Sequence, residues 1–173
     1  MIAVKRIVSG GQTGADRAAL DFALDNGIEC GGHIPLGRRA EDGPIDPKYP
    51  NLIETDSADY AVRTERNVVE SDATLIVSNG ELTGGSALTL AIAHRIGKPV
   101  FHVDLDALAI GSAASNVRSW LAVNGFGTLN VAGPRASSDP RIHASVGELL
   151  RRVFASERTP WTSTAPAIES HSR

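Results

Sequence analysis

The chain has 173 residues, 42% of them hydrophobic and 21% charged, and a formal net charge of −3. This length and composition predict one globular domain with its own core. A slight acidic excess argues against a nucleic-acid partner, because proteins that bind phosphate backbones usually carry excess basic residues. No apolar run approaches the roughly 20 residues of a transmembrane helix, so no membrane partner is expected.

Cys30 is the single cysteine, which excludes an intrachain disulfide and a cysteine-rich metal site. The histidines lack the short spacing of metal ligands, so no metal held by protein side chains is predicted. The first residues lead into an apolar run without the layout of a signal peptide. We therefore expect a cytoplasmic protein.

Apolar runs and amphipathic segments alternate along the chain. Strands are expected over 4–9, 28–33, 52–55, 73–78, 99–103 and 128–131, and helices over 13–26, 59–71, 86–96, 112–124 and around 146–154. Segment 35–50 is rich in proline and glycine, and we expect a long functional loop there without regular elements. The polar tail 156–173 is expected to be disordered, which leaves one domain over 1–155.

Such an alternation is typical of an α/β fold with a parallel sheet and helices on both faces. Ligands of these folds bind at the carboxyl ends of the strands, near the point where the strand order reverses. Two glycine-rich turns are predicted at such ends, and we expect them to face one ligand.

The first turn contains Gly10, Gly11, Gln12, Thr13 and Gly14. Glycines before a helix expose backbone N–H groups, and the helix start carries partial positive charge, so the turn predicts an oxyanion or phosphate site. The pattern is neither a Walker A loop nor G-x-G-x-x-G. The alternative is a tight strand-to-helix connection, in which Thr13 and Asp16 would stand in the order of a capping box.

The second turn contains Thr83, Gly84, Gly85 and Ser86 and allows the same interpretation. The alternative is that Thr83 or Ser86 merely caps the following helix.

Further candidates lie outside the two turns. The pair Arg38 and Arg39 could bind a phosphate or carboxylate, or form internal ion pairs with Glu41 or Asp42. Asn67 could contact the ligand from its helix.

The stretches 9–21, 37–45, 63–68, 82–86 and 130–135 resemble, in the same order, motifs of the molybdenum-cofactor carrier proteins. The resemblance implies a Rossmann-like fold of a wider group of nucleotide-ligand sensors. It also implies binding, storage and transfer of molybdenum cofactor, a pterin that carries a dithiolene and a phosphate. Members of this family are often oligomeric and pass the cofactor to molybdoenzyme apoproteins.

Related phosphoribohydrolases of the wider group resemble Pro-Gly-Gly-x-Gly-Thr-x-x-Glu at the second turn, with a catalytic Glu. Here that position is Ala91, which cannot exchange a proton. The sequence thus favours a binding protein over an enzyme, and the resemblance implies a homo-oligomer. A phosphoribohydrolase-like enzyme and a non-catalytic nucleotide sensor remain the alternatives.

Overall fold

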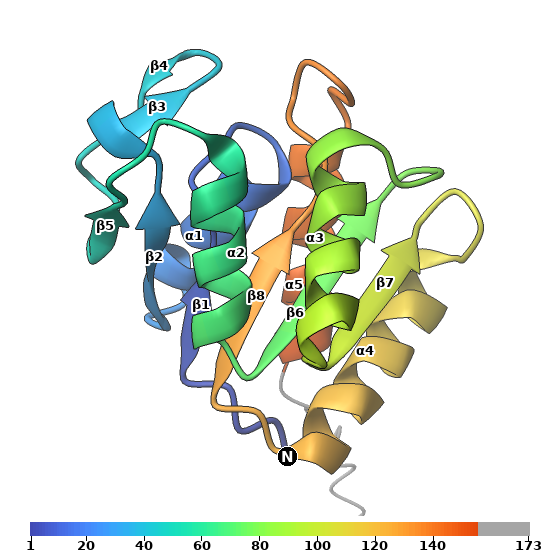
Figure 1. The fold of residues 1–173 in the computed structure, drawn as a ribbon. Coiled ribbons are helices and arrows are strands. Elements are labelled where there is room, and N and C mark those ends of the chain that lie inside the picture. The colour runs from blue at the N-terminus through green and yellow to red at the C-terminus, as the bar shows by residue number, and fades with distance from the viewer. Residues whose placement is uncertain (156–173) are drawn as a thin grey trace, which may run out of the picture.

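The structure is a computed structural model that describes residues 1–155. The tail predicted over 156–173 lies outside the described residues, so its disorder stays a prediction. Within the described residues, strands and helices alternate in a single Rossmann-like α/β domain (Figure 1). The predicted fold class is confirmed.

Six strands form one parallel sheet in the order β5-β2-β1-β8-β6-β7. The strand order reverses around β8, which is the last strand in sequence but lies between β1 and β6. The strands are β1 (Arg6–Val8), β2 (Glu29–Ile34), β5 (Leu52–Glu54), β6 (Ala73–Ser78), β7 (Val100–Asp104) and β8 (Thr128–Ala132).

Helices cover both faces of this sheet (Figure 1). One layer contains α1 (Ala15–Asp25), α4 (Ile110–Asn124) and α5 (Ile142–Phe154), and the other contains α2 (Tyr60–Glu70) and α3 (Gly84–Ile96). Every strand and helix with predicted bounds lies within two residues of them. No helix within residues 1–155 is long and apolar enough to cross a membrane.

The main hydrophobic core lies between the sheet and the layer of α1, α4 and α5. Ile7, Leu75 and Leu129 point into it from the strands, while Leu20 and Leu149 come from the helices, all fully buried. Truncating such a leucine to alanine typically costs about 2–5 kcal/mol. A smaller cluster lies under α2 and α3. This core fixes the strand ends on which the site is built.

Segment 35–50 is more regular than predicted. It contains the 3₁₀ turn η1 (Leu36–Arg38) and a hairpin of β3 (Arg39–Ala40) and β4 (Gly43–Pro44). The Arg38 side chain donates to the Ile45 carbonyl at 2.9 Å, and Ile45 is buried, which anchors the hairpin. The expectation of no regular element was wrong because these contacts hold two short antiparallel strands, the second of which contains Pro44.

Candidate ligand-binding site

A cavity of about 370 Å³ lies at the carboxyl end of the sheet, where the strand order reverses. It is bounded by the starts of α1, α2 and α3 and by the loop that follows β8. Ligands of open α/β folds bind at this place. Its lining residues are Gln12, Asp16, Tyr60, Arg63, Thr64, Thr83, Gly84, Gly85, Ser86, Leu88, Thr89, Ala132, Gly133, Pro134, Arg135, Ser137 and Ser138.

The first glycine turn is packed against protein. A Cβ at Gly14, whose φ is +79°, would lie 2.5 Å from the Pro134 carbonyl oxygen, and a Cβ at Gly10 would overlap the Arg63 guanidinium. The Asp16 carboxylate accepts from the Gln12 N–H at 3.2 Å, and Pro134 accepts from the Ala15 N–H at 3.1 Å. Acceptors within the protein therefore already bind N–H groups at this helix start, where the sequence predicted that an anion would bind.

The capping box predicted for this helix is absent. The helix begins after Gly14, which serves as N-cap, and no side chain caps it. Thr13 instead donates its hydroxyl to the Glu41 carboxylate. The prediction was wrong because the positive φ of Gly14 carries the chain into the helix one residue after Thr13.

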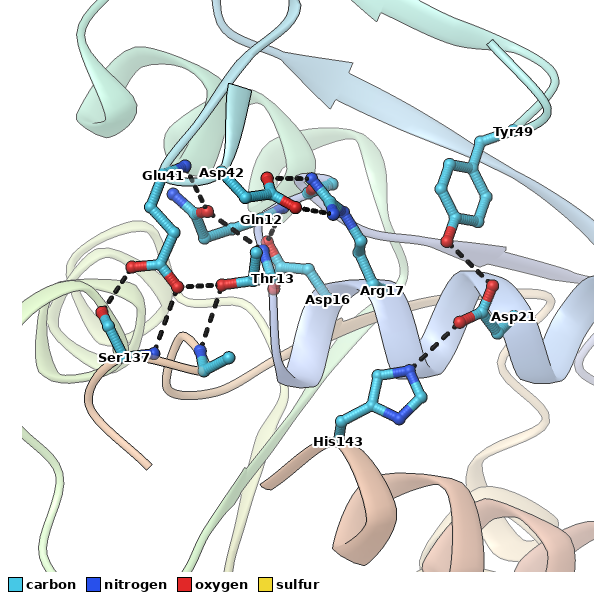
Figure 2. A network of polar contacts seen from close by, with 12 residues as sticks. Gln12, Thr13, Asp16, Arg17, Asp21, Glu41, Asp42, Tyr49, Ser137 and His143 are labelled. Carbon is cyan, nitrogen blue, oxygen red and sulfur yellow. Dashed lines mark hydrogen bonds and ion pairs between the residues drawn. The ribbon is translucent and has the colours of Figure 1, made fainter. Parts of the chain in front are cut away.

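Glu41 connects the hairpin to the wall of the cavity (Figure 2). Its carboxylate accepts from the Ser137 N–H at 3.1 Å and from the hydroxyls of Ser137 and Thr13, which lowers the pKa of Glu41. Its own N–H donates to Gln12 Oε1 at 3.0 Å. The first turn, the hairpin and the loop after β8 are thus held together as one unit.

Gln12 presents an unsatisfied donor at the cavity. Its Oε1 accepts from the N–H groups of Thr13 and Glu41, each at 3.0 Å. Its Nε2 is buried and has no hydrogen-bond partner among the described residues, and the residue is only 5% exposed. A buried donor left unpaired costs about 1–3 kcal/mol, so an acceptor on a ligand would be favourable here.

The second glycine turn is open. Gly84 and Gly85 are exposed, and a Cβ at either would meet no atom within 4 Å. Thr83 is the N-cap of α3 but its side chain makes no capping hydrogen bond. The Ser86 N–H donates to the Thr83 carbonyl at 3.2 Å, so the N–H groups of Gly84 and Gly85 are the uncapped ones. This 13-residue helix directs them and its positive dipole end toward the cavity.

A buried ion pair forms the floor of the cavity. Arg63 Nη1 lies 3.2 Å from the Asp16 carboxylate, and the two side chains are 13% and 5% exposed. Burial raises the pKa of Asp16, while Arg63 and the Gln12 N–H act in the opposite direction. Arg63 Nε is buried and has no hydrogen-bond partner among residues 1–155, so it is a second unsatisfied donor of this ion pair.

Tyr60 is surrounded by arginines at the cavity. The guanidinium carbons of Arg39, Arg63 and Arg135 lie 5.6, 5.8 and 5.5 Å from the centre of its ring. Guanidinium groups at this range interact favourably with the face of an aromatic ring. Tyr60, Arg63 and Arg135 were not predicted as site residues, since they come from α2 and the β8 loop and only the fold brings them together.

Of the predicted site residues, Gln12, Thr83, Gly84, Gly85 and Ser86 line the cavity. The remaining residues of the first turn, Gly10, Gly11, Thr13 and Gly14, lie behind this lining, and Arg39 reaches the site only through Tyr60.

Arg38 and Asn67 are occupied by protein contacts away from the lining. Arg38 donates to the backbone carbonyls of Ile45 and Asp46 rather than to Glu41 or Asp42, and Arg17 is the residue that pairs with Asp42, at 2.7 Å. Both amide atoms of Asn67 bond the backbone of His33, at 2.7 and 2.9 Å. These contacts join β2 to α2.

Ala91 is exposed on α3 and does not line the cavity. Thr89, two residues earlier on the same helix, does line the cavity. Its hydroxyl donates to the Gly85 carbonyl at 2.8 Å. Among the lining residues, the carboxylate is therefore that of Asp16. The absence of a carboxylate at position 91 says little about this cavity.

Residues 7–154 match the model of the family described as "Circularly permutated YpsA SLOG family". The chain belongs to this family. A solved structure of the protein from Syntrophus aciditrophicus SB named "Putative molybdenum carrier protein" is 49% identical in sequence. The match covers 89% of this chain and 97% of that one, with a TM-score of 0.87. No curated protein matches the chain.

The donor set of this family member suits an oxyanion rather than a bare metal ion. Within residues 1–155, no three His, Cys, Asp or Glu side chains group in a way that could hold a metal. Cys30 is buried in the core, and burial raises the pKa of its thiol. Backbone N–H groups, an amide nitrogen and guanidinium groups are the partners that phosphate prefers.

Proposed function

We propose that this protein binds molybdenum cofactor in the cavity, stores it and transfers it without catalysis. The observation that carries the proposal is the uncapped start of α3, which lines the same cavity as Gln12, a residue whose buried Nε2 is unsatisfied. The name of the 49% identical protein from Syntrophus aciditrophicus SB supports a molybdenum-related cargo.

The phosphate of the cargo would accept from the N–H groups of Gly84 and Gly85. A helix start attracts an anion through these N–H groups and its dipole. The cavity volume of about 370 Å³ falls within the range of small-molecule sites. Molybdenum would arrive held by the pterin dithiolene, so the protein has to supply hydrogen bonds and positive charge rather than a metal ligand.

We also propose that the protein acts in the cytoplasm as a homo-oligomer and delivers its cargo to molybdoenzyme apoproteins. The edge strand β5 supports an oligomer, because Ile53 is 53% exposed there and Leu36 beside it is 51% exposed. Exposed apolar side chains at an unpaired sheet edge favour association with another chain. Native mass spectrometry of protein from a cofactor-producing host would report subunit number and bound mass together.

The proposal is tested by titrating the purified protein with molybdenum cofactor and with the metal-free phosphorylated pterin. We expect saturable binding of both, because the phosphate is common to them. Absence of saturable binding to either would contradict the carrier function.

A second candidate function is supported by Asp16. Its buried carboxyl lines the cavity beside Arg63, and its raised pKa is a property of many acid–base groups. A phosphoribohydrolase would release free base from nucleoside monophosphates. Activity that is lost in Asp16→Asn and kept in Glu65→Gln, whose side chain pairs with Arg95 on the surface, would favour this alternative.

A further inference from the structure

The positive charge around Tyr60 extends beyond the cavity. Arg63 and Arg135 line the cavity, whereas Arg39 reaches the Tyr60 ring from the hairpin strand β3 and is exposed. The three guanidinium groups come from three separate segments and lie within 6 Å of the centre of one ring. They therefore form one group of cations around this ring, which we call the Tyr60 arginine cluster.

Carboxylates neutralise this cluster only in part. Asp16 pairs with Arg63 at 3.2 Å, and Glu41 lies 4.0 Å from Arg135. Among the residues that the structure describes, no carboxylate lies within ion-pair distance of Arg39. Gathering like charges is unfavourable unless an anion joins them. An excess of positive charge is thus left at the mouth of the cavity.

The cluster is separate from the donors assigned to the cargo phosphate. Those donors are the start of α3 and Gln12 Nε2, whereas the cluster is built from α2, β3 and the β8 loop. One phosphate bound at the start of α3 would leave Arg39 without a partner. The site is therefore suited to a ligand that carries a second anionic group.

We propose that the Tyr60 arginine cluster is a second phosphate subsite, and that the protein prefers ligands with two or more linked phosphoryl groups. This inference rests on the proposed function, because the first phosphate is the one at the start of α3. Arg39 is the residue that distinguishes longer from shorter ligands. Guanidinium groups suit this task since they can bind phosphate oxygens in pairs.

The test uses inorganic phosphate, pyrophosphate and tripolyphosphate, which contain no ring and differ in length. Their dissociation constants are measured by calorimetry at 150 mM salt, a condition of roughly physiological screening. We expect tripolyphosphate to bind at least about tenfold tighter than phosphate. Arg39→Ala should reduce this ratio to about twofold and leave the affinity for phosphate within about twofold of the wild type.

Arg66→Ala is the matched control. Arg66 is a half-exposed arginine on α2 that lies 4.0 Å from Asp56 and does not line the cavity. The Arg66→Ala variant loses the same charge as Arg39→Ala, but at a position outside the cluster. Its preference for tripolyphosphate should therefore persist. Equal preference for all three probes, or an equal loss of preference in Arg39→Ala and Arg66→Ala, would overturn the second subsite. Failure of phosphate itself to bind would instead overturn the phosphate site of the proposed function, and the inference with it.

Discussion

The two glycine turns look alike in sequence and differ in the structure. Both follow a strand, begin a helix and lie at the carboxyl edge of one sheet. At Gly14 a side chain would collide with the backbone of Pro134, whereas at Gly85 it would meet open space. In the first turn, Gln12 and Thr13 donate their N–H groups to protein side chains, whereas Gly84 and Gly85 of the second turn line the cavity. Neither following helix has a side-chain cap. A glycine pattern therefore predicts a turn, and its packing decides whether a ligand can reach it.

The largest expected effect concerns stability. Gly14→Ala should lower the free energy of unfolding by about 2–4 kcal/mol, because it combines a positive φ with a backbone clash. Gly85→Ala should change it by less than about 0.5 kcal/mol, since the position is open and not left-handed. Urea unfolding of both variants measures the difference. Similar losses in the two variants would mean that the turns are packed alike.

Gly85→Asp sharpens the comparison through binding. A carboxylate at the start of α3 would repel the cargo phosphate, and we expect at least about a 100-fold loss of affinity for the metal-free phosphorylated pterin. The same carboxylate should raise stability by about 0.3–1 kcal/mol through the helix dipole. Gly85→Ala is the control and should bind like the wild type. Unchanged binding by Gly85→Asp would remove α3 from the site.

Gln12→Glu removes the Nε2 donor and adds a negative charge. The substitution keeps Oε1 as the acceptor for the Thr13 and Glu41 N–H groups and replaces the unpartnered Nε2 by an oxygen. Loss of the hydrogen bond, together with repulsion between the new carboxylate and the phosphate, should weaken pterin binding about 10-fold or more. Calorimetry checks this, with thermal unfolding to verify that the fold is kept. Wild-type affinity would show that Nε2 does not meet the ligand.

The smallest expected effect is a pH dependence from Asp16. Because burial raises the pKa of Asp16 in the folded state, the folded protein binds this proton more tightly than the unfolded chain. Its contribution to stability should therefore fall as pH rises from the unfolded value of 3.8 through the raised folded value.

Asp16→Asn should remove this fall. Carboxyls with lowered pKa values, such as Asp21 and Glu41, contribute in the opposite direction and are present in both proteins. The difference between the unfolding free energies of wild type and variant, measured between pH 4 and 7, isolates Asp16. A difference that does not vary with pH would contradict the raised pKa.

The periodicity of the sequence was enough to predict the parallel sheet, the helices and the edge at which the cavity lies. It also identified Gln12 and the Gly84–Gly85 turn, because both depend on local chain direction. Residue roles that depend on distant contacts could not be predicted. A side chain at position 14 would clash with Pro134, and one at position 10 would clash with Arg63. Both partners lie more than 50 residues away in the chain.

Contacts made by the fold also explain why Asn67 and Arg38, which the sequence offered as ligand-binding residues, bond to the protein backbone instead. Their residue types suit ligand binding, but the fold places a backbone partner beside each of them. Tyr60 and its three arginines come from α2, β3 and the β8 loop, and no spacing in the sequence links them. The three arginines stand within stretches that carried the family resemblance, 37–45, 63–68 and 130–135, whereas Tyr60 does not.

The central claim is that the cargo phosphate binds at the open turn rather than at the packed one. A crystal structure with the metal-free phosphorylated pterin tests it most directly. We predict the phosphate on the N–H groups of Gly84 and Gly85, with Gln12 Nε2 donating to the ligand. A phosphate held by the backbone of Gly10 to Gly14 would contradict the account.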